Sequence, residues 1–139
     1  MLSVRTIHVT GQDLVRLRQI IEFMRPQSPR DSENIRRLRR ALETADVKEP
    51  ADIPRDVVTM NSRVTVCDMD TGERSVYTLV YPERADYREG RISVLAPMGS
   101  AMLGCRAGDT VEWGVPKGTK RMLIEEIHYQ PEASGDFHM

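Results

Sequence analysis

The side chains best suited to chemistry lie in a short segment between residues 30 and 40. Asp31 and Glu33 are two carboxylates that could meet basic groups on a partner. Four arginines that could contact an acidic or phosphate-bearing surface follow them, namely Arg36, Arg37, Arg39 and Arg40. The segment 90–113, the most distinctive of the chain, holds no nucleophile beside a base, no Walker glycine loop and no cluster of metal-ligand residues, and the three histidines, His8, His128 and His138, do not cluster in the sequence. We therefore expect a protein that is not an enzyme, with no catalytic residue, no metal site and no cofactor.

Both features also have a plainer interpretation. Acidic residues in the first turn of a helix stabilise it through the helix dipole by about 0.3–1 kcal/mol, and arginines on an exposed helix face form pairs within the helix. Residues 11–46 carry eight arginines against six acidic residues. This excess of two positive charges is too small to predict nucleic-acid binding, so we expect no direct sequence-specific contact with nucleic acid.

The composition indicates one small protein without a membrane segment. Of its 139 residues 29% are charged and 40% hydrophobic, with a formal net charge of -1, which is typical of a globular domain. No apolar run approaches the roughly 18 residues that span a bilayer, and the first residues do not resemble a secretory signal. Cys67 and Cys105 lack a CxxC partner, which favours reduced thiols over a disulfide. We expect a cytoplasmic monomer that makes no contact with membranes.

Two successive segments have apolar residues at spacings of three and four, which predicts two amphipathic helices. These residues are Leu14, Leu17, Ile21 and Met24 in the first segment, and Ile35, Leu38, Leu42 and Ala45 in the second. Pro26 and Pro29 interrupt the pattern, because proline does not fit inside a continuing helix. A short connection favours antiparallel packing, so residues 11–46 are expected to form a helical hairpin of coiled-coil type. Asp31 and Glu33 would lie at its tip.

The proline-containing segment 48–54 divides the chain into two expected domains, 1–49 with the short antiparallel hairpin and 50–139 with a sheet. Strands are expected at 62–68, 73–81, 92–95, 110–115 and 121–129, with one short helix at 97–103. The expected fold is therefore α+β, with a mostly antiparallel sheet of five or six strands. The expected core residues are Val64, Val66, Val76, Leu79, Ile92, Val94, Leu103, Val111, Trp113, Met122, Ile124 and Ile127.

The short helix is the segment that we expect to dock on a partner. Pro97, Met98, Gly99 and Ser100 combine small residues, which allow close backbone approach, with one adaptable apolar side chain. The alternative is that Gly99 and Ala101 only let the helix lie close to the sheet. By composition, the last residues from Gln130 onward are expected to be a frayed terminus.

Several elements of residues 50–136 together resemble one bacterial family. They are the segments 54–64 (PRDVVTMNSRV), 78–82 (TLVYP), 96–104 (APMGSAMLG), 111–113 (VEW) and 129–133 (YQPEA), followed by Gly135 and Asp136. This pattern resembles the C-terminal domain of the Gre transcript-cleavage factors. It is most similar to their short relatives, the regulators of nucleoside diphosphate kinase.

The resemblance implies an FKBP-like fold for the second domain and binding of core RNA polymerase at the rim of its secondary channel. The implied function is a transcription regulator that competes with Gre-type factors and affects nucleoside diphosphate kinase levels indirectly. One alternative is a true transcript-cleavage factor acting through Asp31 and Glu33, but arms of about 22 Å are shorter than those of Gre factors. A second alternative is a peptidyl-prolyl isomerase, which the scarcity of aromatic residues disfavours.

Overall fold

The computed structural model describes residues 7–23 and 29–136, and within these ranges it is an α+β fold, as predicted. The α-helices of the described residues are α1 (Gly11–Phe23), α2 (Pro29–Glu43) and α3 (Pro97–Met102). The strands are β1 (His8–Val9), β2 (Asp46–Val47), β3 (Arg63–Asp68), β4 (Arg74–Val80), β5 (Arg91–Ser93), β6 (Thr110–Val115) and β7 (Gly118–Tyr129). Three short 3-10 helices complete the described elements, namely η1 (Pro50–Asp52), η2 (Pro82–Arg84) and η3 (Tyr87–Glu89).

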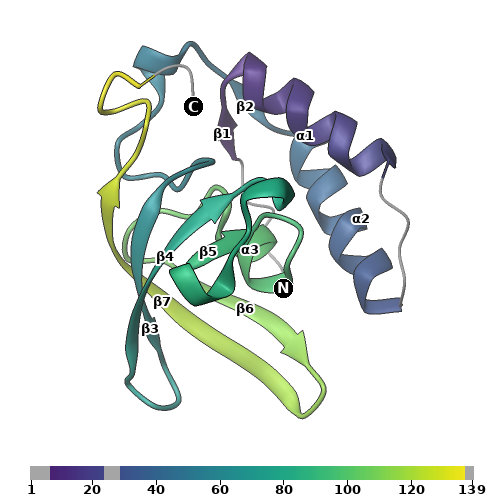
Figure 1. The fold of residues 1–139 in the computed structure, drawn as a ribbon, viewed down its shortest axis with the longest axis vertical. Coiled ribbons are helices and arrows are strands. Elements are labelled where there is room, and N and C mark those ends of the chain that lie inside the picture. Colours follow the sequence, from purple (N-terminus) through teal and green to yellow (C-terminus); the bar gives the residue numbers. More distant parts are fainter. Residues whose placement is uncertain (1–6, 24–28, 137–139) are drawn as a thin grey trace.

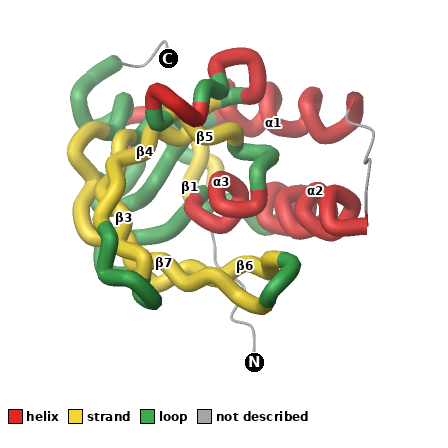
Figure 2. The backbone as a smooth tube through the Cα atoms, turned by 60° about the horizontal axis from the view of Figure 1, so that its bottom comes forward, coloured by secondary structure: helices red, strands yellow, loops and turns green. Residues whose placement is uncertain are grey.

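The main sheet has five strands in the order β5-β4-β3-β7-β6. Only the β4–β5 pair of this sheet is parallel, and its other three pairings are antiparallel. The sheet curls around α3, and α1 and α2 lie beyond α3 on the same side (Figures 1 and 2). The expected strand positions are close to those observed, although β7 is three residues longer at its start than the sequence suggested.

A second, two-stranded sheet joins the two ends of the helical pair. β1 precedes α1 and β2 follows α2, and the two strands pair in parallel with His8 beside Asp46 and Val9 beside Val47. The start of α1 and the end of α2 are therefore held side by side. Residues 5–9 alternate polar and apolar in the sequence, which predicts a short first strand. The sequence gave no sign of the partner strand β2, because two residues are too few to show an alternating pattern.

The helical pair and the sheet share one hydrophobic core. Leu17 and Ile21 of α1 and Leu38 of α2 belong to the same buried cluster as Val64 and Ile124 of the sheet. The helices therefore pack against the body of the protein. Met24, predicted as the last position of the first apolar seam, lies outside the described residues.

The core prediction was wrong for Val76, which is 51% exposed. Tyr77 and Leu79 on the same strand face the core, so the alternation of β4 points Val76 to the outer face. Trp113 and Ile127 are only half-buried and pack at the edge of the cluster. The remaining expected core residues are buried.

The segment after β7 is folded, contrary to the prediction from composition. Gln130 and Glu132 are 3% and 8% exposed. The Gln130 amide donates to the backbone oxygens of Pro54 and Val57, at 2.7 and 2.6 Å. The Glu132 carboxylate accepts a 2.6 Å bond from the Thr59 hydroxyl. These bonds attach the C-terminal turn to the segment that leads into β3.

Candidate docking surface

The helix α3 begins sharply after β5. The Ser93 hydroxyl accepts a bond from the Leu95 amide, and Ala96 takes an extended conformation at the N-cap. Pro97 follows at the first helical position, where proline fits because that backbone N–H would have no partner in the helix. Pro97, Met98 and Ser100 are half-buried, so part of each side chain is presented to the surface.

Gly99 has a packing role and is itself buried. A Cβ built on Gly99 would lie 2.0 Å from the backbone oxygen of Ser93 and 3.2 Å from the Cα of Val94. Both contacts are with backbone, so α3 can lie this close to β5 only with glycine at this position. Gly99 therefore lets α3 lie close to the sheet, which is the alternative to a docking role that the sequence left open. The partly exposed residues of the predicted docking segment are its neighbours Pro97, Met98 and Ser100.

Asn34 of α2 holds the α3 segment from the opposite side. Its amide nitrogen donates to the backbone oxygen of Leu95, and its amide oxygen accepts a bond from the Ser100 hydroxyl. Asn34 is buried and lies only one turn after the start of α2. We call this arrangement the Asn34 clasp. Because of it, only the first turn of α2 extends beyond the contact with the body.

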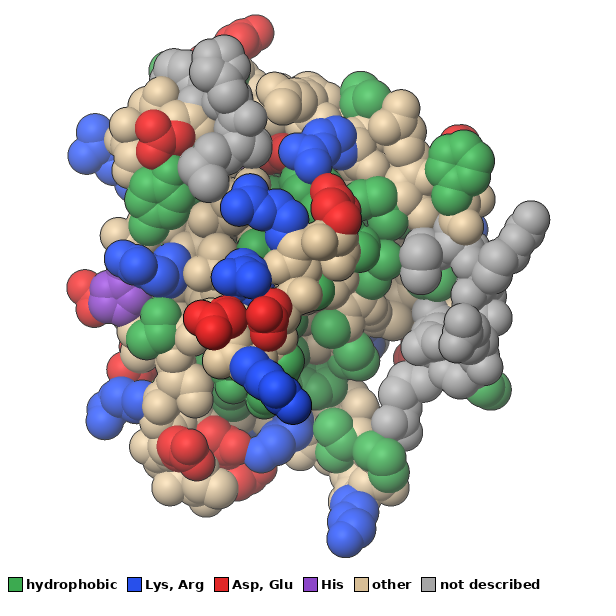
Figure 3. Space-filling model, viewed as in Figure 1, with side chains coloured by type: hydrophobic (Ala, Val, Ile, Leu, Met, Phe, Trp, Pro, Cys, Tyr) green, Lys and Arg blue, Asp and Glu red, His purple; other side chains and the backbone are tan. Residues whose placement is uncertain are grey.

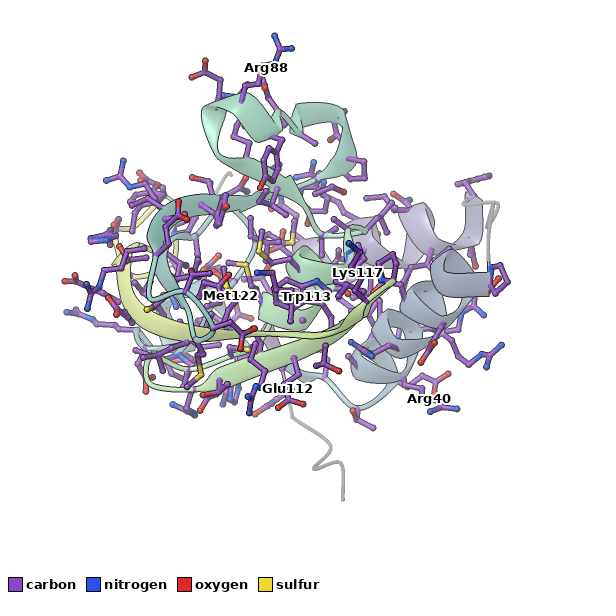
Figure 4. All side chains as sticks on the ribbon, turned by 90° about the horizontal axis from the view of Figure 1, so that it is seen from below. Arg40, Arg88, Glu112, Trp113, Lys117 and Met122 are labelled. Carbon is purple, nitrogen blue, oxygen red and sulfur yellow. The ribbon has the colours of Figure 1, made fainter. Side chains whose placement is uncertain are left out.

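Glu33 of the predicted tip and the four predicted flank arginines lie on the outside of α2. Glu33 is exposed, as are Arg36, Arg37, Arg39 and Arg40, and Arg40 points away from the sheet (Figure 4). Asp31 lies in the first turn of α2, and its side chain is outside the described part of the structure. The four arginines therefore face solvent, while the opposite face of α2 packs against the core. The predicted basic flank and the α3 segment do not form one surface.

The anchor between α1 and the sheet was not predicted from the sequence. The buried Tyr81 hydroxyl donates a 2.6 Å bond to the carboxylate of Asp13, which is also buried. The Arg16 guanidinium lies 3.8 Å from the centre of the Tyr81 ring, and it also contacts Glu83 at 3.4 Å. Thr10 lies directly before α1, and its hydroxyl accepts a 3.2 Å bond from the Asp13 amide, which is the capping pattern that the Thr10–Asp13 spacing in the sequence predicts. The capping pattern was the available signal for Asp13, but it did not indicate the Tyr81 bond.

Two carboxyl groups in this region titrate abnormally because they are buried. Desolvation raises the pKa of the Asp13 carboxyl, and the bond from Tyr81 and the charge of Arg16 only partly oppose this. Desolvation likewise raises the pKa of Glu132, with the Thr59 hydroxyl acting in the opposite direction. These shifts follow from anchoring roles, since each carboxyl bonds one element to another.

The surface chemistry suits binding of a partner. Hydrophobic side chains gather beside α3, while acidic and basic side chains are interspersed over the rest of the face in Figure 3. Among residues 7–23 and 29–136 no group of three or more His, Cys, Asp or Glu side chains could hold a metal ion. No helix in the same ranges is long and apolar enough to cross a membrane.

This fold defines a small α+β protein with a clasped helical pair. The chain belongs to the GreA/GreB family: residues 53–129, more than half of the chain, match the family described as "Transcription elongation factor, GreA/GreB, C-term". The resemblance predicted from the sequence is thereby confirmed.

Several known proteins are similar to this chain. The Regulator of nucleoside diphosphate kinase of Escherichia coli K12 is 45% identical over 97 residues, 69% of this chain and 71% of that protein. The transcription elongation factor GreA of Magnetococcus marinus is 36% identical over 95 residues, 68% of this chain and 60% of that protein. A solved prokaryotic transcription elongation factor GreA/GreB from Nitrosomonas europaea superposes with a TM-score of 0.74 at 38% identity, covering 89% of this chain and 98% of that one. These relatives are named as a regulator and as elongation factors, none as an enzyme.

Proposed function

We propose that this protein is a non-enzymatic transcription regulator that binds core RNA polymerase at the rim of its secondary channel. It would compete there with Gre-type factors and affect nucleoside diphosphate kinase levels indirectly, through transcription. The proposal rests chiefly on the family match over residues 53–129, which contains α3 and all five strands of the main sheet, β3 to β7. Similarity to a regulator of nucleoside diphosphate kinase at 45% identity supports the second part.

The α3 segment is the proposed contact with the polymerase. It is held from both sides, by Gly99 against β5 and by the Asn34 clasp from α2, so it is fixed before any partner arrives. A preformed surface loses little conformational entropy on binding. Met98 is half-buried and packs in part against the core, and the rest of its side chain offers an adaptable apolar contact.

The helical pair would obstruct the channel mouth as part of a rigid body. The rise per residue gives α1 a length of about 20 Å and α2 about 22 Å. We expected two arms extended from the body, but the shared core and the Asn34 clasp hold both helices against it. Such a body can cover an opening, while its described helices have little free length to reach deep inside.

The experiment that tests the contact is a pull-down of core polymerase with Met98→Asp. A charge at this position should weaken polymerase binding by about tenfold or more, since burying an unpaired charge in an interface is costly. Met69→Asp is the matched control, because Met69 is an exposed methionine in the turn between β3 and β4. Circular dichroism must show both variants folded. If Met98→Asp binds core polymerase as tightly as the original protein does, α3 is not part of the contact.

A further inference from the structure

We propose that the outer face of the sheet carries a binding site for a phosphate group, independent of the contact proposed for α3. The site is a cleft of about 270 Å³ at one end of the main sheet. Its polar lining residues are Asn61, Arg63, Thr78, Arg84, Arg91 and Tyr129. We call it the arginine cleft.

The register of the sheet builds the arginine cleft. Arg63 of β3 pairs with Thr78 of β4 on one side and with Tyr129 of β7 on the other. Thr78 pairs in turn with Arg91 of β5. These four residues therefore form one row across four strands, facing away from the core. Arg63 and Arg91 are separated by two strand spacings, about 10 Å. Arg84, whose backbone oxygen accepts a bond from Arg91, lines the same cleft, so the long side chains of Arg63 and Arg84 can reach one anion above Thr78.

The cleft has unused positive charge. Arg91 is held by Asp86, at 3.5 Å, and donates to the backbone oxygen of Arg84, at 2.9 Å. In contrast, no carboxylate within the described ranges lies within ion-pair distance of the Arg63 or Arg84 guanidinium. Asp136 accepts the bond from the Tyr129 hydroxyl, which raises the pKa of Tyr129 to about 12. Two guanidinium groups are thus available for a ligand.

The chemistry of the cleft favours phosphate. Guanidinium groups bind phosphate with two parallel N–H donors, and the Thr78 hydroxyl adds a further donor between them. A volume of about 270 Å³ lies just below the roughly 300–1,000 Å³ of sites that enclose a whole small molecule. The cleft should therefore hold the phosphate or diphosphate group and leave the rest of a larger ligand outside. Free pyrophosphate, a nucleoside diphosphate and single-stranded RNA all present this chemistry.

The test is a calorimetric titration of the full chain with pyrophosphate at physiological salt, compared with Arg63→Gln/Arg84→Gln. Neither guanidinium has a partner among the described residues, so the double variant should stay folded, which thermal unfolding checks. We expect saturable binding that the double variant weakens by at least about tenfold. Arg18→Gln/Arg88→Gln is the matched control: it removes two exposed arginines outside the cleft and should bind as the original does.

Further titrations identify the type of molecule that carries the bound phosphate group, and they test whether any anion would bind as well. Tighter binding of a nucleoside diphosphate than of pyrophosphate would assign a nucleotide, and tighter binding of a short single-stranded RNA would assign nucleic acid. Backbone amide signals of Asn61, Thr78 and Arg91 should shift on binding in two-dimensional NMR spectra. The proposal is overturned if pyrophosphate does not bind, if the double variant binds equally well, or if succinate binds as tightly as pyrophosphate.

Discussion

The buried carboxyl of Asp13 links the first turn of α1 to Tyr81 in the core. Burial raises its pKa, so in the pH range between its ordinary and its raised pKa the folded state binds more protons than the unfolded state. Its charge therefore lowers the stability of the fold as the pH rises through the raised pKa. The bond from Tyr81 offsets part of that cost.

Asp13→Asn should remove this pH dependence while keeping an oxygen for the Tyr81 hydroxyl. Relative to the original protein, the variant should gain in free energy of unfolding as the pH rises from about 4 to 7. Denaturant unfolding at several pH values measures this difference. Tyr81→Phe should instead lower the free energy of unfolding by about 1–3 kcal/mol, because the buried carboxyl loses its donor. A pH profile of Asp13→Asn identical to that of the original would contradict the assignment.

Gly99 is the residue that sets the distance between α3 and β5. Gly99→Ala should lower the free energy of unfolding by about 1–3 kcal/mol, because its Cβ would overlap backbone atoms that cannot move alone. Gly114→Ala is the control: a Cβ there meets no atom within 4 Å, and the change should stay within about 0.5 kcal/mol. Thermal or denaturant unfolding of the two variants measures this difference. Equal stability of Gly99→Ala and Gly114→Ala would show that α3 shifts without loss of free energy of unfolding.

At the level of elements, the Asn34 clasp decides whether the helical pair moves with the body. Asn34→Ala removes both bonds to the α3 segment and should cost about 1–3 kcal/mol. Amide hydrogen exchange should then become faster in α2 and around Leu95, while β3 and β7 keep their protection. Glu33→Ala, at an exposed neighbouring position, should leave the exchange pattern unchanged. Uniformly faster exchange throughout the protein would indicate global destabilisation instead of a released clasp.

The sequence predicted those elements whose patterns are local. Pro29 and the apolar spacing indicated α2, and the alternation between 62 and 81 indicated β3 and β4. Long-range pairings such as Asn34 with Leu95 and Tyr81 with Asp13 are 61 and 68 residues apart, and no local pattern encodes them. The burial of Gln130 was missed for the same reason, because its partners Pro54 and Val57 are more than 70 residues away and the local composition suggested a frayed terminus. Asn34 stands next to the apolar seam of α2, which was the only signal for the clasp.

On the scale of the whole molecule, the position of Glu33 favours the proposed regulator over the alternative of a cleavage factor. Glu33 precedes the clasped Asn34 by one residue, so it stays near the body of the protein. A carboxylate in this position cannot be carried deep into a channel by the described helices. The compact body with a preformed α3 segment suits competition for an outer site instead.

The most direct test of this account is displacement of a labelled Gre factor from core RNA polymerase. The protein is titrated into the preformed complex, and fluorescence anisotropy reports the Gre factor that remains bound. We predict complete displacement by the original protein and by Met69→Asp, and displacement by Met98→Asp only at about tenfold or higher concentration. A ternary complex in which both proteins stay bound, or a folded protein that displaces nothing, would contradict the proposed function.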